Sequence, residues 1–346
     1  MTPPVPPASA ETREWLLETD RAHLWHPWAP HRISSETLII VSGHGCHVRD
    51  AEGRRFLDAK ASGLNATLGY GCRPVIEAMN EQLTRLMTYD TVEGSNLPAI
   101  ELARRIAELT GPDLTRTFFC NSGSEAIETA VRVARAYHAL LGAPERTRIV
   151  SVDNGYHGTT AAAAACTTGS EAAGFVRVPG PAGPGRPDGR PGVEGVRAYL
   201  AEHATATAAL VLEPVQGLGG HIVSDDDLAA LRALCDEHDV LLVLDEVLTG
   251  FGRTGRMFAY EHAGVRPDLL VTSKGLTSGY ASLSAVTTTP RVFDVFGRDR
   301  ETGGFAHGHT HSGHATACAA ALAVLDVLEG GVLDTRASAA SNSWTR

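Results

Sequence analysis

The stretch "VLLVLDEVLTG", residues 240–250, decides the fold class of this chain. Five apolar residues follow one another without polar alternation, as in a strand that is covered on both faces of a parallel sheet. The run ends at Asp245, a carboxylate that is costly to bury unless a cationic partner faces it. We therefore expect a buried strand that carries an acidic side chain to one edge of a sheet. An aspartate that only caps the next helix is the alternative.

Further apolar runs of this kind occur in the chain, namely "RTFFC" (116–120), "RIVSVD" (148–153), "AALVLE" (208–213) and "DLLVTS" (268–273). Helical patterns lie between them, for example over 124–141 and 226–238. Strands that alternate with helices predict an α/β fold with a mostly parallel central sheet.

The two ends of the chain depart from this pattern. Residues 1–10 are rich in proline and are expected to be disordered, and "GCHVRDAEGRRFLDA" (45–59) indicates a hairpin. A long apolar helix is expected from about Ala315, and "GGVLDTRASAASNSWTR" (330–346) has no periodicity. We expect an exposed apolar face on this helix, formed by Ala319, Leu322, Val324 and Leu325.

The composition is typical of a soluble globular protein. Of the 346 residues, 43% are hydrophobic and 20% are charged, and the formal net charge is −10. This acidic balance disfavours a nucleic-acid partner, which would need a basic face. The first residues contain no apolar signal core, and no run approaches the roughly 20 apolar residues of a membrane span. The six cysteines form no CxxC pair, so we expect reduced thiols in a cytoplasmic protein without a membrane partner.

One of the chain's two lysines follows the last of the apolar runs. Lys60 and Lys274 are the only lysines among 30 lysine and arginine residues. Lysine, unlike arginine, can lose its proton and attack a carbonyl group to form a Schiff base. Ligands bind beyond the carboxyl ends of parallel strands. We therefore expect Lys274 to lie at one edge of the sheet with Glu213 and Asp245.

The helix after the first run begins with "NSGSEA", residues 121–126. Ser122 and Glu125 form a capping-box pattern, which is typical of an ordinary helix start. Alternatively, Gly123 and Ser124 bring backbone N–H groups and a hydroxyl to an anion at the positive end of the helix. The segment alone leaves both interpretations open.

Two other patterns are weak. Residues 250–255, "GFGRTG", match the GxGxxG fingerprint of dinucleotide-binding proteins, but no strand leads directly into them and no long amphipathic helix follows. We expect no metal site at the cluster His307, His309, His311 and His314, because no acidic or cysteine ligand is adjacent. Thr310 and Ser312, in the same segment, either cap the next helix or contact a phosphate.

Taken together, several ordered motifs resemble those of the class-III aminotransferases, which are fold-type-I enzymes that use pyridoxal phosphate (PLP). The motifs are "NSGSEAIETAVRVAR", "NGYHG", "LEPVQGLGG", "LDEVLTGFGRTGRMFAYEH", "PDLLVTSKGLTSG" and "HTHSGH". The resemblance extends from about Leu24 to Glu329. One such motif could arise by chance, whereas all of them in this order indicate a shared fold and chemistry.

The resemblance implies a role for each matching position in the cofactor site. Lys274 would bind PLP as an internal aldimine and then move the proton between the substrate and the cofactor. Asp245 would pair with the pyridinium nitrogen. The remaining positions would be Tyr156 and Val247 against the ring faces, and Ser122, Gly123, Ser124 and His157 around the phosphate and the ring.

The resemblance also implies substrates and a partner. The expected reaction is a ping-pong transfer of an amino group from an amine or amino acid to a keto acid or aldehyde. Thr310 would reach the phosphate of the neighbouring subunit's cofactor, which implies a homodimer with shared active sites. The expected substrate-side residues are Trp25, Trp28, Glu213 and Gly308.

Several narrower functions remain as alternatives. "LWHPW" (24–28) is similar to the entry segment of diaminopelargonate synthases, but "KASGLNATLGYG" (60–71) lacks the aromatic pair expected there. A general amine or ω-amino-acid aminotransferase is therefore favoured over a biotin-pathway enzyme. An aminomutase or decarboxylase on the same scaffold, a PLP-binding remnant without turnover and, last, a nicotinamide dehydrogenase are the other hypotheses.

The predicted organisation has four parts. A disordered segment at 1–10 precedes an N-terminal arm with a hairpin at 11–60 and a PLP-binding large domain at 61–314. The last part, 315–346, is expected to be a connecting helix with the truncated start of a C-terminal small domain. In many relatives that small domain carries the arginine that binds the substrate carboxylate.

Overall fold

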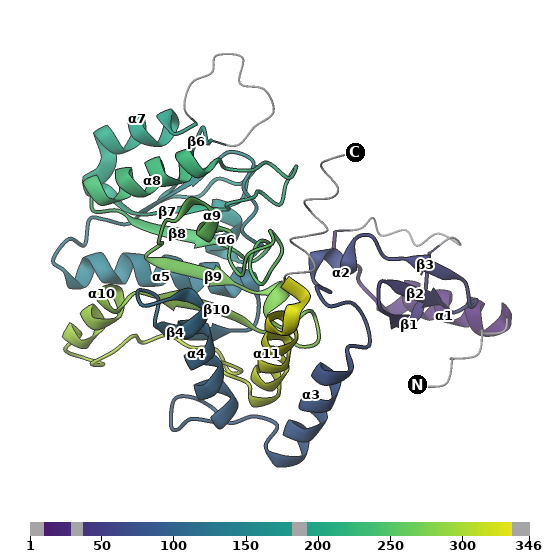
Figure 1. The fold of residues 1–346 in the computed structure, drawn as a ribbon. Coiled ribbons are helices and arrows are strands. Elements are labelled where there is room, and N and C mark those ends of the chain that lie inside the picture. Colours follow the sequence, from purple (N-terminus) through teal and green to yellow (C-terminus); the bar gives the residue numbers. More distant parts are fainter. Residues whose placement is uncertain (1–9, 29–36, 182–191, 334–346) are drawn as a thin grey trace. The chain divides into compact units, whose positions relative to one another are not determined.

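The computed structural model describes residues 10–28, 37–181 and 192–333. The predicted disordered segment at 1–10 and the aperiodic tail at 330–346 lie largely outside these residues. The chain divides into two compact units, Met1–Arg73 and Pro74–Arg346. Figure 1 labels most of the helices and strands of both units, and each unit is described by itself.

The first unit contains an antiparallel sheet with the strand order β1-β2-β3. The predicted hairpin is confirmed as β2 and β3. Gly53, at φ 81°, turns the chain between them, and the Asp50 carboxylate accepts hydrogen bonds from the backbone N–H groups of Glu52 and Arg54. The elements are α1 (Ala10–His23), β1 (Ile40–His44), β2 (His47–Asp50), β3 (Arg55–Leu57) and the short α2 (Ala61–Leu64).

The second unit is built around a seven-stranded sheet with the order β4-β10-β9-β8-β7-β5-β6. Neighbouring strands are parallel except at β10, which runs antiparallel to both β4 and β9. The predicted mostly parallel sheet is therefore confirmed. The strands are β4 (Arg116–Cys120), β5 (Arg148–Val152), β6 (Phe175–Val178), β7 (Thr207–Leu212), β8 (Leu241–Asp245), β9 (Leu269–Thr272) and β10 (Ser284–Thr288).

Helices connect these strands, and the two predicted ones are confirmed as α5 and α8, each shifted by one residue. Ser122 and Ser224 cap them by accepting hydrogen bonds from the N–H groups of Glu125 and Asp227. The helices are α3 (Arg73–Arg85), α4 (Leu97–Thr110), α5 (Gly123–Leu140), α6 (Ala161–Cys166), α7 (Glu194–His203), α8 (Asp225–Glu237), α9 (Tyr260–Ala263), α10 (Pro290–Phe293) and α11 (Ala315–Val327), with 3₁₀ turns at Ala204–Ala206, Lys274–Leu276 and Asp294–Arg298 and a π turn at Leu328–Val332.

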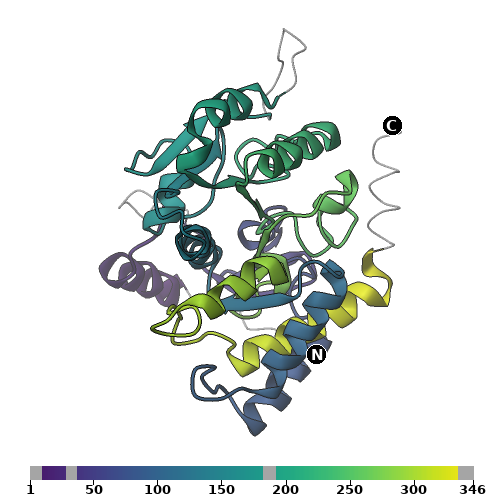
Figure 2. The same cartoon turned by 90° about the vertical axis from the view of Figure 1, so that its left-hand side faces the viewer.

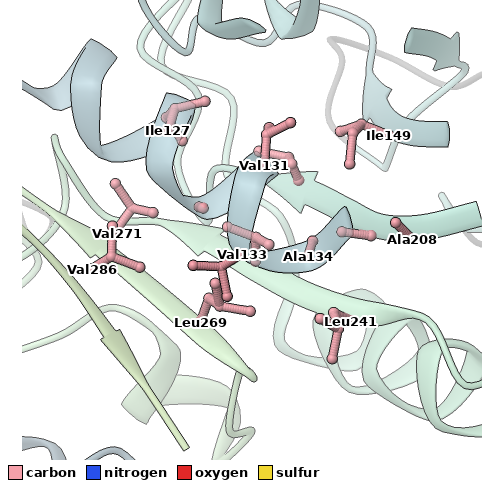
Figure 3. Packing of buried hydrophobic residues seen from close by; sticks show 14 of the residues in the cluster. Ile127, Val131, Val133, Ala134, Ile149, Ala208, Leu241, Leu269, Val271 and Val286 are labelled. Carbon is pink, nitrogen blue, oxygen red and sulfur yellow. The ribbon is translucent and has the colours of Figure 1, made fainter. Parts of the chain in front are cut away.

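The main core lies between α5 and one face of the sheet. Leu241, Leu269 and Val271 belong to the same buried cluster as Val133 and Ala134 of α5 (Figure 3). Side chains alternate between the two faces of a strand, and the intervening residues are also fully buried, among them Leu210, Leu242 and Leu270. Both faces of the sheet are thus covered, which explains why these strands lack polar alternation.

Two strands, β6 and β10, do not appear among the predicted apolar runs. β10 has the sequence "SAVTT", yet all of its residues are buried. Its hydroxyl groups find partners on β4 and beyond it: Thr287 Oγ1 lies 3.1 Å from Thr117 Oγ1, and Ser284 donates to the carbonyl oxygen of Ser122 at 2.7 Å. Because these partners are distant in sequence, composition alone does not predict a central strand here.

The exposed apolar face expected on the last helix is wrong: Val324 and Leu325 are completely buried, and Ala319 and Leu322 are partly buried. α11 runs beside α4 (Figure 2), and the two helices contact each other along their length. By length and composition alone the segment Ala315–Val332 could cross a membrane, but 56% of it is buried inside the protein. The core helix of a globular unit meets the same criterion, and α11 packs as such a helix.

The double coverage of the sheet predicts a large effect for truncation of a central side chain. Ile149 in β5 is 1% exposed, whereas Ile222 is 70% exposed. We expect Ile149→Ala to lower the free energy of unfolding by about 2–5 kcal/mol through lost burial and a residual cavity. Ile222→Ala, the matched control, should change it by no more than about 0.5 kcal/mol. Urea titration followed by circular dichroism measures both, and equal effects would contradict the packing described.

Candidate functional site

Polar residues follow the parallel strands at one edge of the second unit's sheet. β5, β7, β8 and β9 run in the same direction, and β4 shares it because β4 and β9 are both antiparallel to β10. Glu213 follows β7, Asp245 ends β8 and Lys274 follows β9. Both carboxylates act electrostatically on the Lys274 amine. Glu213, Asp245 and Lys274 therefore lie at the same carboxyl edge of the sheet, as predicted.

Lys274 is a half-buried amine in a constrained turn. Its φ is 31°, in a region that non-glycine residues rarely adopt, and such positions cost about 1–3 kcal/mol and cluster at functional sites. Burial lowers the pKa of the ammonium group, while the charges of Asp245 and Glu213 raise it in part and Arg253 lowers it further. The net effect is a lowered pKa, which increases the fraction of neutral, nucleophilic amine.

Asp245 and His157 form a buried pair beside this amine. The side chain of His157 is 0% exposed and that of Asp245 is 3% exposed, and the imidazole Nδ1–H donates to Asp245 Oδ2 at 2.8 Å. Burial alone would lower the pKa of His157, but the hydrogen bond and charge of Asp245 outweigh it, so the pKa is raised. Asp245 Oδ1 accepts from the N–H of Val247 at 3.0 Å. Asp245 is thus held in a fixed orientation by hydrogen bonds to both of its oxygens.

Glu213 joins the loop after β5 to the loop after β7. Its Oε2 accepts from the N–H of Tyr156 at 2.8 Å, and its Oε1 accepts from the N–H of Gly217 at 2.9 Å. Burial raises the pKa of this carboxyl to about 7, and the nearby charge of Asp245 adds to the effect. Tyr156 is therefore positioned by its backbone, and Glu213 can exchange a proton near neutral pH.

The N-terminus of α5 forms a tight cradle at the same edge. Ser124 Oγ accepts from the N–H of Thr159 at 3.1 Å. A Cβ atom on Gly158 would lie 2.2 Å from that Oγ, and one on Gly123 would lie 3.0 Å from Val247. At Gly158 only glycine allows this approach, and at Gly123 a side chain would require Val247 to shift. The Ser122 cap bonds the N–H of Glu125, so the N–H groups of Gly123 and Ser124 precede the capped one at the positive end of an 18-residue helix.

This set of groups fits pyridoxal phosphate. The cofactor needs an amine for its aldehyde, a carboxylate for its pyridine nitrogen, an anion site for its phosphate and flat surfaces for its ring. Lys274, Asp245 and the start of α5 are groups of the first three kinds, and the backbone N–H groups of Tyr156 and Val247 bond to Glu213 and Asp245. The Nε2 atom of His157 is buried and has no hydrogen-bond partner among the described residues, as for a group whose environment is incomplete without a ligand.

Four further predicted residues are exposed. Thr310 and Gly308 are exposed, in the segment that precedes α11. Trp25 and Trp28 belong to the first unit and are 81% and 84% exposed. Their predicted roles toward the substrate or a second subunit therefore remain predictions.

The GxGxxG match at 250–255 is a set of turns with no strand leading directly into it. Phe251 and Gly252 both have positive φ, 59° and 86°, and no helix begins before α9 at Tyr260. The segment therefore lacks the strand–turn–helix geometry of a dinucleotide site. One of its residues nevertheless affects the site, because the Arg253 charge acts on the Lys274 pKa.

Sequence reasoning missed two residues that hold the loop after β5. Gln216 Nε2 donates to the carbonyl oxygen of Asp153 at 2.7 Å, and Thr167 Oγ1 accepts from the N–H of His157 at 2.9 Å. Gln216 lies inside the "LEPVQGLGG" motif, so its position in that motif is a usable signal. Thr167 carries no such signal, because its contact depends on the fold of a separate loop.

Comparison with known proteins places the chain among aminotransferases. The family described as aminotransferase class-III matches residues 30–345. The adenosylmethionine-8-amino-7-oxononanoate aminotransferase of Geobacter sulfurreducens is 38% identical, over 91% of this chain and 74% of that protein. The protein of the same name from Nitratidesulfovibrio vulgaris is 39% identical, over 94% of this chain and 64% of its own length.

Comparison with solved structures gives the same result as comparison with these sequences. A thermostable (S)-enantioselective omega-transaminase from Thermomicrobium roseum superimposes with a TM-score of 0.87 at 35% identity, and the match covers 94% of this chain and 76% of that one. The chain therefore spans about two thirds to three quarters of the length of the relatives it matches.

The raised pKa of Glu213 predicts a pH-dependent stability. The ordinary value is 4.5 and the folded value about 7, so between these limits the native state keeps a proton that the unfolded chain has lost. Stability should therefore fall as the pH rises from about 4.5 to 7. Glu213→Gln should remove up to one proton from this dependence, whatever its effect on stability at a single pH.

Urea titrations at several pH values measure the slope. The matched control is Glu237→Gln, because Glu237 is exposed at the end of α8. The control should keep the wild-type slope. If the unfolding free energy of Glu213→Gln depends on pH as steeply as that of wild type, Glu213 is not the titrating group.

Proposed function

Because this chain belongs to the class-III aminotransferase family, we propose that it transfers an amino group at Lys274 from an amine or amino acid to a carbonyl acceptor. The observation that carries this proposal is a half-buried lysine with a lowered pKa beside the buried Asp245–His157 pair. Amino transfer needs an amine that is neutral part of the time and a carboxylate that stays ionised. Lys274 and the Asp245 carboxyl group both lie at the carboxyl edge of the sheet.

Pyridoxal phosphate, the cofactor of this family, supplies an aldehyde that accepts the amino group and a pyridinium ring that withdraws electrons from the substrate Cα. The proposed part of Asp245 is to hold the proton on the ring nitrogen. His157 orients the Asp245 carboxylate through the Nδ1–H hydrogen bond at 2.8 Å. A carboxylate that rotated or became protonated would lose this effect.

Lys274 has two proposed tasks, to bind the cofactor and to move a proton. Its lowered pKa supports both, since the neutral amine is the nucleophile and also the base. Gly123 and Ser124 would bind the phosphate with N–H groups at the start of α5, and Tyr156 and Val247 would enclose the ring. The hydrogen bond from the Tyr156 N–H to Glu213 supports this position for the aromatic side chain.

The substrate-side proposals rest on fewer contacts. Glu213, whose pKa is about 7, could change its protonation state in response to the charge of the substrate. Trp25, Trp28 and Gly308 are proposed from the resemblance of their motifs. A second candidate function is the adenosylmethionine-dependent reaction for which two relatives are named, and it is favoured by those names alone.

We also propose a cytoplasmic location.

We propose that the protein acts as a homodimer in which Thr310 serves the neighbouring subunit's site. The segment around Met87–Ile100 exposes apolar side chains, for example Met87 at 63%, Val92 at 89% and Leu97 at 74%. Asn96 Nδ2 donates to the carbonyl oxygen of Gly313 at 2.9 Å, which holds this segment next to the one that carries Thr310. One surface therefore offers both an apolar contact area and the predicted phosphate ligand.

The two lysines allow a sharp test of the amine. We expect wild type and Lys60→Ala to bind PLP, to be labelled once per chain after borohydride reduction, and to change their absorbance when an amine donor is added. Lys274→Ala should lose the label and at least about 10³-fold of the amino-transfer rate. Peptide mass spectrometry locates the label, because Lys60 and Lys274 are the only lysines and the N-terminal amine lies in a different peptide.

Each result has a distinct meaning for this proposal. A label on Lys60, or a label that survives Lys274→Ala, would refute the assignment of the amine. A Lys274 label whose absorbance no amine changes would favour a cofactor-binding protein without turnover. Binding of a nicotinamide cofactor in place of PLP would restore the dehydrogenase alternative.

The homodimer is tested separately by charge substitution. Val92→Glu should shift the protein toward a monomer in light scattering and weaken PLP binding, because the partner's Thr310 would be lost. Ile222→Glu, at an exposed residue (70%) outside this surface, is the matched control and should stay dimeric. A wild-type monomer, or a Val92→Glu dimer, would contradict the proposed interface.

A further inference from the structure

An apolar pocket lies at the other end of β4 and β10 from the candidate functional site. Its volume is about 360 Å³, and it is lined by β4, β10, α5, α10 and the segment that follows α10. Four of the chain's nine phenylalanines line it: Phe118, Phe293, Phe296 and Phe305. None of the residues placed above in the cofactor or substrate site belongs to its lining. The pocket is thus a separate cavity in the second unit.

The polar groups at the pocket already have partners or balance one another. The guanidinium of Arg116 lies over the Phe293 ring at 5.0 Å from its centroid. Thr117 Oγ1 lies 3.1 Å from Thr287 Oγ1. Arg116 and Asp294 have opposite charges, so the lining carries no net charge. Apolar walls with few polar groups select uncharged ligands, because an ion would lose its hydration without compensation.

Two glycine residues of the lining have open space where a side chain would begin. Gly297 and Gly304 both line it, and a Cβ atom on either would meet no heavy atom within 4 Å. Neither has a positive φ, so the backbone does not require glycine at these two positions. The missing side chains therefore leave space, and a larger residue at either position could occupy it.

The aromatic lining connects the pocket to the segment before α11. The Phe305 ring lies 6.0 Å from Phe118 and 5.0 Å from Phe296. His307 stacks on Phe118 at 5.7 Å, with an interplanar angle of 7°, and its Nε2 lies 3.0 Å from Thr129 Oγ1 of α5. A molecule in contact with Phe118 and Phe305 would therefore act directly on the packing of residues 305–307.

We propose that this pocket binds a small uncharged aromatic molecule of one or two rings, and that binding tightens the packing of residues 303–310. The rings of Phe118, Phe296 and Phe305 offer edges and faces for offset or edge-to-face contacts with such a ligand. Dry cavities lined by aliphatic and aromatic side chains bind molecules of this class. The inference does not depend on the proposed amino transfer, since it concerns another cavity.

The test uses the full chain with indole as the probe. Saturation-transfer NMR measures binding of indole and of the charged analogue indole-3-acetate, and hydrogen exchange with mass spectrometry follows peptides that cover 299–312. We expect indole to bind, indole-3-acetate to bind at least about tenfold more weakly, and exchange in these peptides to slow only with indole.

Two variants that fill the pocket are compared with a matched control. Gly304→Leu and Gly297→Leu should weaken indole binding at least about tenfold by occupying its space. Gly330→Leu is the control, because Gly330 also has no heavy atom within 4 Å of a Cβ position and lies outside the pocket. It should bind indole like wild type.

Every outcome decides part of the proposal. No indole binding by wild type, or equal binding by both pocket variants and the control, would refute the site. Binding that is lost in the pocket variants without slower exchange in residues 303–310 would retain the site and refute the coupling. Equal binding of indole and its carboxylate would refute the assigned ligand class.

Discussion

The contact between Asp245 and His157 is the interaction on which the site depends most. A carboxylate that is 3% exposed would be unfavourable without a donor, and the imidazole of the loop after β5 provides one at 2.8 Å. Loss of one member of such a buried pair typically costs about 3–5 kcal/mol, because the other charge is left without compensation. The pair therefore fixes the loop that carries Tyr156 relative to β8, and with it the surroundings of the Lys274 amine.

Other side chains at the carboxyl edge of the sheet also bond to the backbone of the surrounding loops. Glu213 bonds two backbone N–H groups in different loops, and Gln216 bonds the end of β5. These side chains hold loops in place, while the strands beneath them are fixed by burial on both faces. A site on loops thus gains the precision of the rigid sheet, which a transfer reaction at one carbon atom requires.

The electrostatics of the edge follow from burial combined with close charges. Burial lowers the pKa of Lys274 and raises that of Glu213 to about 7, whereas the Asp245–His157 contact raises the pKa of the imidazole. The pKa of the amine is thus lowered while those of the Glu213 carboxyl and the His157 imidazole are raised, all within one small region. Shifted pKa values of this kind are typical of functional sites, where neighbouring groups exchange protons.

From the sequence alone one could predict the α/β class, five of the seven strands of the large sheet, α5 and α8, and the set of residues at the strand ends. Burial on both faces leaves an unbroken apolar run that can be recognised without a structure, and Lys274 stands out because arginine replaces lysine almost everywhere else. Tertiary structure decided the rest. β10 is a central strand although "SAVTT" is not apolar, since its hydroxyl groups bond to residues more than 150 positions away. The burial of Val324 and Leu325 depends on α4, and the pairing of His157 with Asp245 joins residues that are 88 positions apart. Contacts at such separations depend on how the whole chain packs, and no local pattern of residues encodes them.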